Sequence, residues 1–229
     1  MKLELVEKQY NFRFPEIFRN LWNDGMLDWN KGWNEPWTQE RNWFTEIYPK
    51  IKDTPPLLLH TGGFDFQLLS EHEIIHYDFY EHWHPKHQFI PFAQTNAGDL
   101  FAFYKNIEIE GQHPIVLVWH DANRTEVLSK NFEDFIFRRM LERVANIEED
   151  DIIDNFEGQI DLFQKKVLAD LSTTKKYLNQ EYIDILTEIF NRPFLTVETI
   201  ISVKEMNSIF EKTIYFDQIN IEFQHETEL

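Results

Sequence analysis

Residues 88–105 read QFIPFAQTNAGDLFAFYK, and this stretch decides the fold class. Residues 89–93 and residues 100–104 are all apolar. Between them, TNAGD at 95–99 carries the Asn, Gly and Asp that are typical of a tight turn. The pattern predicts two antiparallel strands joined by a hairpin turn, and the neighbouring segments predict the elements that complete the fold.

The flanking segments predict one more central strand and several helices. HPIVLVWH at 113–120 is a continuous apolar run, as expected of a buried strand. SKNFEDFIFRRMLERVAN at 129–146 has apolar residues at helical spacing. Upstream, Pro15 suits the first turn of a helix that ends at Gly25. PPLLLHTGGFDFQLLS at 55–70 predicts strands around a Gly-Gly turn.

The chain changes character near residue 147. The acidic run IEEDD at 147–151 is followed by three helical patterns, and then by TIYFDQINIEF at 213–223, which is a candidate closing strand. We therefore expect an α+β domain at residues 1–147 and a mainly helical, acidic extension at residues 148–229.

The net charge is −18, with 40 acidic and 22 basic side chains. A surface of this sign repels phosphate backbones, so we expect no direct contact with nucleic acid, and it favours a partner with a basic surface. The alternative is that the charge only keeps an aromatic-rich chain dissolved. The sequence has no run of 18 apolar residues, no apolar signal region at its N-terminus and no cysteine. These features favour a cytoplasmic protein without a membrane span.

EHEIIHYDFYEHWHPKHQ at 71–88 holds five of the nine histidines and raises the question of a metal site. His72 and His76 are four residues apart, and Ser70 with Glu73 predicts a helix start just before them. HEIIH lacks a recognisable third ligand, however, and the other spacings match no closed zinc site. We interpret the tract as an exposed loop. A metal-dependent hydrolase that uses these histidines is the less favoured alternative.

Other signatures of catalysis are missing from the sequence. His120 followed by Asp121 has the pattern of a general base with an orienting carboxylate, but no serine or cysteine nucleophile motif accompanies it. There is no Walker loop, no GxGxxG, no GxSxG and no EF-hand loop. We expect neither catalysis nor a cofactor.

Four parts of the chain, in order, resemble the SUKH superfamily. They are FRFPEIFRNLWNDG (12–25), FQLLSEHEI (66–74), FIPFAQTNAGDLFAF (89–103), and PIVLVWHD (114–121) followed by LSKNFEDFIFRRM (128–140). Two features depart from the family pattern. A Trp-rich segment at 29–43 replaces what is often a short stretch with glycine, and residues 148–229 have no counterpart in a minimal family domain.

The resemblance implies an α+β fold with a mixed central sheet and helices packed against it. It also implies protein binding without catalysis. Bacterial relatives are immunity proteins that bind and neutralise a cognate toxin, often a nuclease, whereas fungal relatives are scaffolds and regulators of cell-wall synthesis. An immunity-type protein that occludes a basic toxin is therefore the first hypothesis, and a scaffold is the second.

Tight binding to a toxin needs desolvated aromatic anchors together with complementary charge. The candidate contact residues come from the Trp-rich segment, the His-rich loop and the hairpin turn: Asp28, Trp29, Trp33, Glu35, Trp37, Asp78, Tyr80, Glu81 and Asp99. Two structural alternatives stand beside this hypothesis. The tryptophans would cap the core under a long loop, and Asp99 would bond the backbone amides of its own turn.

Overall fold

A computed structural model describes residues 3–33, 35–63, 65–147, 149–196 and 199–226. The chain forms two compact units. Unit 1 comprises Met1–Asn20, Phe64–Phe135 and Glu211–Leu229, and unit 2 comprises Leu21–Gly63 and Ile136–Phe210. Residues 1–147 and residues 148–229 were predicted as separate domains. This division stays a prediction.

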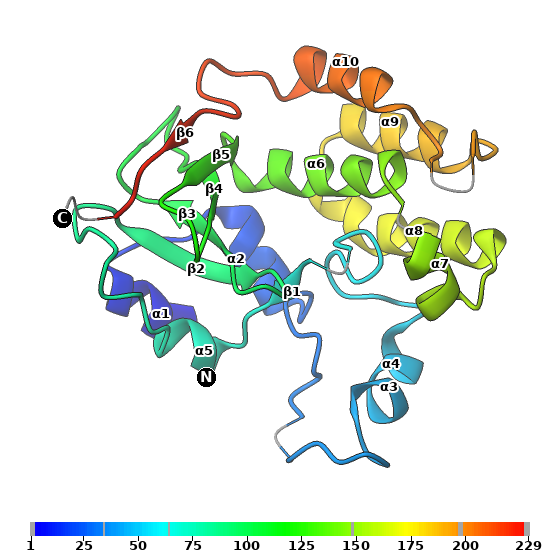
Figure 1. Cartoon of the computed structure of the whole chain (residues 1–229), viewed down its shortest axis with the longest axis horizontal. Coiled ribbons are helices and arrows are strands. Elements are labelled where there is room, and N and C mark those ends of the chain that lie inside the picture. Colours follow the sequence, from blue (N-terminus) through cyan, green and yellow to red (C-terminus); the bar gives the residue numbers. More distant parts are fainter. Residues whose placement is uncertain (1–2, 34, 64, 148, 197–198, 227–229) are drawn as a thin grey trace. The chain divides into compact units, whose positions relative to one another are not determined.

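Unit 1 is built on a six-stranded sheet whose strands lie in chain order (Figure 1). The strands are β1 (Gln67–Leu68), β2 (Phe89–Gln94), β3 (Leu100–Tyr104), β4 (Ile115–Val118), β5 (Thr125–Ser129) and β6 (Glu222–Phe223). The α+β class is confirmed. The sheet was expected to be mixed, but all of these strands pair antiparallel. The connections between successive strands from β2 to β5 are all shorter than the dozen or so residues that a parallel crossover needs, so these neighbours are antiparallel.

The predicted hairpin lies in the middle of this sheet. β2 and β3 pair along their length, with a register shift between Pro91 and Ala93, where the proline has no amide to donate. Gly98 adopts a φ of +102°, which favours glycine. Thr95 closes the turn: its amide donates to the Asp99 carbonyl at 2.8 Å, and its hydroxyl accepts from the Asp99 amide at 2.9 Å.

An aromatic core packs against the sheet of unit 1. Its rings come from the segment between α1 (Leu3–Tyr10) and α2 (Glu16–Asn23), from α2 itself, from the start of α6 (Phe132–Ala145) and from the sheet. Phe103 on β3 is 0% exposed. Five other phenylalanine rings have centroids 5.3–5.6 Å from that of Phe103: Phe12, Phe14, Phe18, Phe92 and Phe132. Apolar residues from several separate segments of the sequence thus form one cluster.

Two predicted helix boundaries are confirmed by their capping contacts. Ser70 and Glu73 form a reciprocal capping box at the start of α5 (Glu71–Ile75). Gly25, with a φ of +69°, follows α2, and its amide donates to the Trp22 carbonyl at 3.0 Å.

Unit 2 is helical over most of its length. It contains the rest of α6 together with α3 (Trp43–Glu46), α4 (Tyr48–Ile51), α7 (Glu149–Phe156), α8 (Ile160–Thr174), the 3₁₀ helix η1 (Lys175–Tyr177), α9 (Gln180–Phe190) and most of α10 (Val203–Thr213). The expected helical character of the C-terminal part is therefore confirmed. None of the described helices is long and apolar enough to cross a membrane.

The expected strands around Gly62 and Gly63 are wrong for the leucine-rich part of that segment. Leu58 adopts a φ of +57°, which a strand does not contain. The amides of His60 and Thr61 donate to the carboxylate of Asp170 at 2.9 and 2.7 Å, so they are not available to a neighbouring strand. An apolar run indicates that a segment is buried. It does not tell whether the buried segment is a strand or a turn.

The C-terminal segment closes the sheet of unit 1, although β6 is shorter than the predicted strand at 213–223. The side-chain oxygen of Asn123 accepts from the amides of His225 and Glu226, both at 2.8 Å. The His84 amide donates to the His225 carbonyl at 2.7 Å. The His225 side chain is buried, with Nδ1 2.9 Å from Thr125 Oγ1, and burial lowers its pKa to about 4.

We expect the attachment of this segment to weaken in acid. An unfolded histidine has a pKa of about 6.5, so the contribution of His225 is fully present above pH 6.5 and is lost as the pH falls toward 4. Hydrogen exchange corrected for intrinsic rates should give lower protection of residues 220–226 at pH 4.5 than at pH 7. The pKa of neighbouring His87 is also lowered, mainly by burial. His225→Phe should reduce the difference between the two pH values, and an undiminished difference would assign the effect to His87.

Candidate protein-binding surface

Several turns of unit 1 carry acidic and aromatic side chains. The acidic turn surface, as we name it, consists of Asp78, Tyr80, Glu81, Asp99, His120 and Asp121. The first three follow α5, Asp99 ends the turn between β2 and β3, and the last two follow β4. The ring of Tyr80 is 40% exposed, and its centroid lies 6.4 Å from that of His120. Tertiary structure thus brings three separate loops together.

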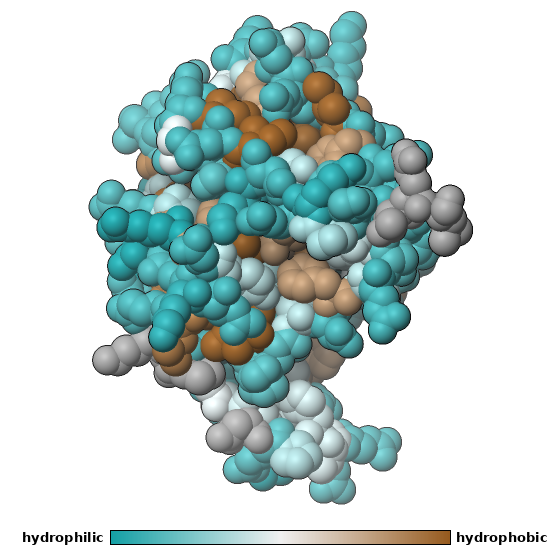
Figure 2. All heavy atoms as spheres, turned by 90° about the vertical axis from the view of Figure 1, so that its left-hand side faces the viewer, coloured by the Kyte–Doolittle hydropathy of each residue, from teal (hydrophilic) through white to brown (hydrophobic). Residues whose placement is uncertain are grey.

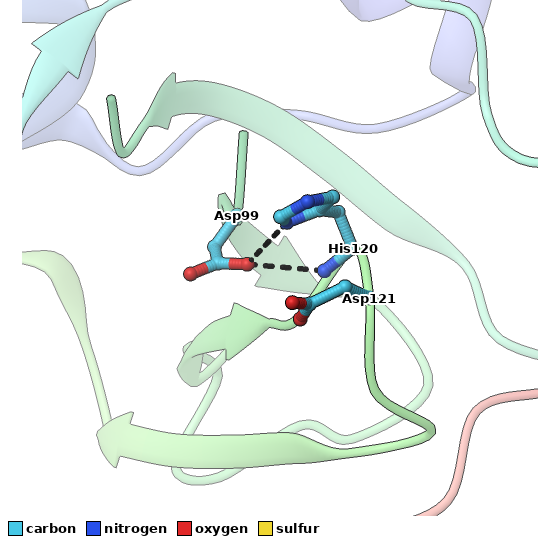
Figure 3. A group of neighbouring side chains, drawn as sticks. All are labelled: Asp99, His120 and Asp121. Carbon is cyan, nitrogen blue, oxygen red and sulfur yellow. Dashed lines mark hydrogen bonds and ion pairs between the residues drawn. The ribbon is translucent and has the colours of Figure 1, made fainter. Parts of the chain in front are cut away.

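A hydrogen-bonded pair joins two of these loops. Asp99 Oδ1 accepts from the His120 amide at 3.1 Å and lies 2.8 Å from His120 Nδ1 (Figure 3). The structural alternative expected Asp99 to bond the amides of its own turn. Its carboxylate instead bonds an amide beyond β4, because the antiparallel pairing of β3 and β4 places Leu100 opposite Val118. Asp99 therefore helps to fix the shape of the surface.

The chemistry of this pair differs from the sequence-based expectation. Asp99, not Asp121, is hydrogen-bonded to the His120 ring. Asp99, His120 and Asp121 also offer three possible metal-ligand atoms within 4.8 Å of one another. Since Nδ1 of His120 is engaged by Asp99, Nε2 is the ring nitrogen left for another group. This arrangement is suited to a fixed polar contact with a bound partner.

The acidic turn surface carries exposed carboxylates, because Asp78, Glu81 and Asp121 are exposed. Figure 2 shows by hydropathy that hydrophilic residues predominate on one face of the molecule. Burial raises the pKa of Tyr77 to about 12, and the charge of Asp99 adds to the effect. Tyr77 therefore stays neutral at ordinary pH, and the charge of the surface comes from its carboxylates.

The histidine tract does not converge on one point. The rings of His72 and His76 are exposed, with centroids 4.5 Å apart. His84 Nδ1 accepts from the Lys86 amide at 3.0 Å, and His87 Nδ1 lies 2.8 Å from the Tyr104 hydroxyl. Among the described residues, no three of the tract's histidines offer ligand atoms within 4.8 Å of one another. The loop interpretation is confirmed for residues 77–82 and 84–88.

The remaining predicted residues lie in unit 2, on residues 28–43, which we call the tryptophan loop. Its described residues 28–33 and 35–42, blue in Figure 1, lie between α2 and α3 without regular structure, and Trp43 begins α3. Trp29 is half-buried, and its Nε1 donates to the Leu57 carbonyl at 3.0 Å. Trp43 Nε1 donates to the Trp29 carbonyl at 3.2 Å. These two tryptophans anchor the loop within its own unit.

The other two tryptophans of the loop form a stack. The ring centroids of Trp33 and Trp37 are 4.9 Å apart, and the ring planes differ by 3°. The guanidinium carbon of Arg41 lies 4.9 Å from the Trp33 ring centroid, and Arg41 also pairs with Glu35 at 3.0 Å and with Glu46 at 3.1 Å. Sequence reasoning missed Arg41 because no local pattern links it to Trp33.

The predicted contact residues therefore fall into two groups, one on each unit. Unit 2 carries Asp28, Trp29, Trp33, Glu35 and Trp37, and unit 1 carries Asp78, Tyr80, Glu81 and Asp99. Asp28 is exposed, and its carboxylate accepts from the Asn30 amide at 3.0 Å. The role of all nine residues in binding stays a prediction.

Comparison with known proteins adds one finding. Residues 2–138 match the model of the SMI1 / KNR4 family (SUKH-1), and this range holds more than half of the chain. It includes β1 to β5 of unit 1, the tryptophan loop and the acidic turn surface. No curated protein and no solved structure matches the chain significantly.

Proposed function

The chain belongs to the SMI1 / KNR4 family (SUKH-1), and we propose that it is an immunity-type protein that binds a cognate protein toxin and neutralises it by occlusion. The proposal is for binding without catalysis and without a cofactor, in the cytoplasm of the cell that needs protection. The toxin is expected to have a basic surface, as a nuclease does.

The observation that carries this proposal is the acidic turn surface. Three exposed carboxylates and the exposed ring of Tyr80 lie on loops that a buried sheet holds in place. The Asp99–His120 pair fixes two of these loops to each other. A preorganised surface loses little conformational entropy when it binds, and its charge speeds the encounter with a basic partner.

A protein that neutralises a toxin must bind it tightly. Nanomolar binding corresponds to about −12 kcal/mol, and steering by charge alone does not produce the slow dissociation that this requires. Aromatic side chains that become buried on binding supply most of such energy. Tyr80 on unit 1 and Trp37 on unit 2, which are 40% and 45% exposed, have this character.

Capture and neutralisation together test the proposal. The untagged protein, coupled to a matrix, is exposed to lysate of its source cells, and the retained proteins are identified by mass spectrometry. We expect one stoichiometric partner that stops growth when expressed alone in a host cell, and growth should recover when this protein is expressed with it. Several weak partners without toxicity would instead support the scaffold hypothesis. A captured partner whose toxicity persists on co-expression would contradict neutralisation.

Charge reversal at the acidic turn surface should slow association with the captured partner. We expect Asp78→Lys with Glu81→Lys to lower the association rate by about tenfold at low salt and to make the rate less sensitive to salt. Asp28→Lys with Glu35→Lys applies the same test to the tryptophan loop. The matched control is Glu211→Lys with Asp217→Lys, which reverses two other exposed acids of unit 1. Equal effects from all three pairs would show that only the overall charge matters.

A further inference from the structure

The aromatic stack of the tryptophan loop consists of Trp33, Trp37 and the guanidinium of Arg41. Trp37 lies parallel to Trp33, with a centroid distance of 4.9 Å. The guanidinium of Arg41 lies over the same Trp33 ring, also at 4.9 Å. One face of the Trp37 ring therefore lies against Trp33. We call the opposite face of Trp37 its outer face.

Hydrogen bonds between residues close in sequence hold this stack in place within the loop. Trp33 Nε1 donates to the Glu35 carbonyl at 2.8 Å. The amide of Thr38 donates to the Arg41 carbonyl at 2.8 Å, and the Arg41 amide donates to Thr38 Oγ1 at 3.0 Å. The Trp33–Trp37 pair is thus prearranged, and a ligand does not have to order it.

Trp37 is the member of the stack that is left open. Its side chain is 45% exposed, and its Nε1 donates no hydrogen bond to any residue in the described part of the chain. Glu40, three residues from Trp37 in sequence, is exposed, whereas Glu35 is already paired with Arg41. The face of an indole ring attracts a cation more strongly than it attracts a neutral group.

We propose that the outer face of Trp37 is a binding site for an arginine side chain of the partner protein. The loop itself shows this chemistry, because the Trp33 ring already carries the guanidinium of Arg41. A partner's arginine on Trp37 would place a second guanidinium on the stack. The identity of the ligand as a residue of a basic protein partner rests on the proposed function.

Arginine fits this site better than lysine for two reasons. Its guanidinium is planar and stacks flat on an indole, and it is more weakly hydrated than an ammonium, so less hydration is lost on contact. Tryptophan is the strongest of the aromatic acceptors for such a cation. The net charge of −18 adds a general attraction for positive side chains.

The site is tested with the full-length protein and a short peptide, without the partner. The peptide acetyl-Gly-Arg-Gly-amide is titrated into protein labelled with ¹⁵N at tryptophan, and the indole N–H signals are followed at about 0.15 M salt, which screens long-range charge. Trp33→Phe and Trp37→Phe assign the signals. We expect the arginine peptide to shift the Trp37 and Trp33 signals more than those of the other tryptophans. The citrulline peptide, which has the same shape without the charge, should produce shifts at least severalfold smaller.

Two variants make the outcome decisive. Trp37→Ala should reduce the shift at Trp33 severalfold, whereas Tyr215→Ala, which removes a 60% exposed aromatic residue of unit 1, should leave it unchanged. Equal shifts with the citrulline peptide, larger shifts with a norleucine peptide, or an unchanged Trp33 shift in Trp37→Ala would each overturn the arginine site. Because no partner is used, such a result leaves the proposed function intact. Failure to capture a toxin would reject the proposed function while leaving the peptide result valid.

Discussion

Phe103→Ala is expected to destabilise unit 1 by about 3–5 kcal/mol, the cost of a large cavity in a close-packed aromatic core. The Phe103 side chain is 0% exposed, and five phenylalanine rings surround it. The variant removes a ring on β3 that packs against rings from α2, α6 and β2. Since a typical domain is stable by only about 5–15 kcal/mol, a large part of the variant should unfold under mild denaturant.

Urea unfolding followed by circular dichroism measures this loss of stability. Two control variants distinguish the loss of core packing from the mere removal of a phenylalanine ring. Phe103→Leu keeps most of the volume, so we expect a loss of about 1.5 kcal/mol or less. Phe44→Ala removes the same ring from a site that is 66% exposed, so we expect a change within about 0.5 kcal/mol. A loss for Phe103→Ala that does not exceed that for Phe44→Ala would show that the cluster does not stabilise the sheet.

The elements that could be predicted from the sequence are those with strong local patterns. The hairpin at 88–105 combines two apolar runs with a turn that requires Gly98, and the structure contains it as β2 and β3. The capping box of Ser70 and Glu73 and the helix end at Gly25 are local contacts, a few residues apart. In each case, one short segment contains all the groups that determine the structure.

The elements that could not be predicted depend on residues far apart in the sequence. The leucines of 57–59 resemble a strand, but their turn is stabilised by Asp170, more than a hundred residues later. The Asp99–His120 pair exists because β3 and β4 lie side by side, and neither residue has a local sequence signal for the other. The candidate site was therefore predicted as separate residues, whereas its arrangement came only with the fold.

Asp170 on α8 leads to the second large expected effect. It is 0% exposed, and its Oδ2 accepts from the amides of His60 and Thr61 and from the Thr61 hydroxyl, at 2.7–2.9 Å. Its Oδ1 and the nearby Thr174 Oγ1 are buried without a hydrogen-bond partner among the described residues. Burial raises the pKa of Asp170 to about 7, although the hydrogen bonds oppose this shift.

The sign of the pH effect follows from this shift. An unfolded aspartate has a pKa of about 3.9, so the folded state holds the proton more tightly than the unfolded state does. The protein should therefore lose stability as the pH rises from about 4 to about 7. The full loss corresponds to about 4 kcal/mol, because each pKa unit is worth about 1.4 kcal/mol.

Asp170→Asn should remove most of this cost, because the amide stays neutral and its oxygen can accept the same three hydrogen bonds. We expect unit 2 to gain about 3–4 kcal/mol at pH 8 and less than about 1 kcal/mol at pH 4.5, measured by urea unfolding with tryptophan fluorescence. Asp161→Asn, an exposed acid on the same helix, should change stability little at either pH. Asp170→Ala should destabilise at both, because it leaves the donors of His60 and Thr61 unpaired. A loss of stability for Asp170→Asn at pH 8 would mean that the fold needs the negative charge, which the positive charge of Arg143 favours.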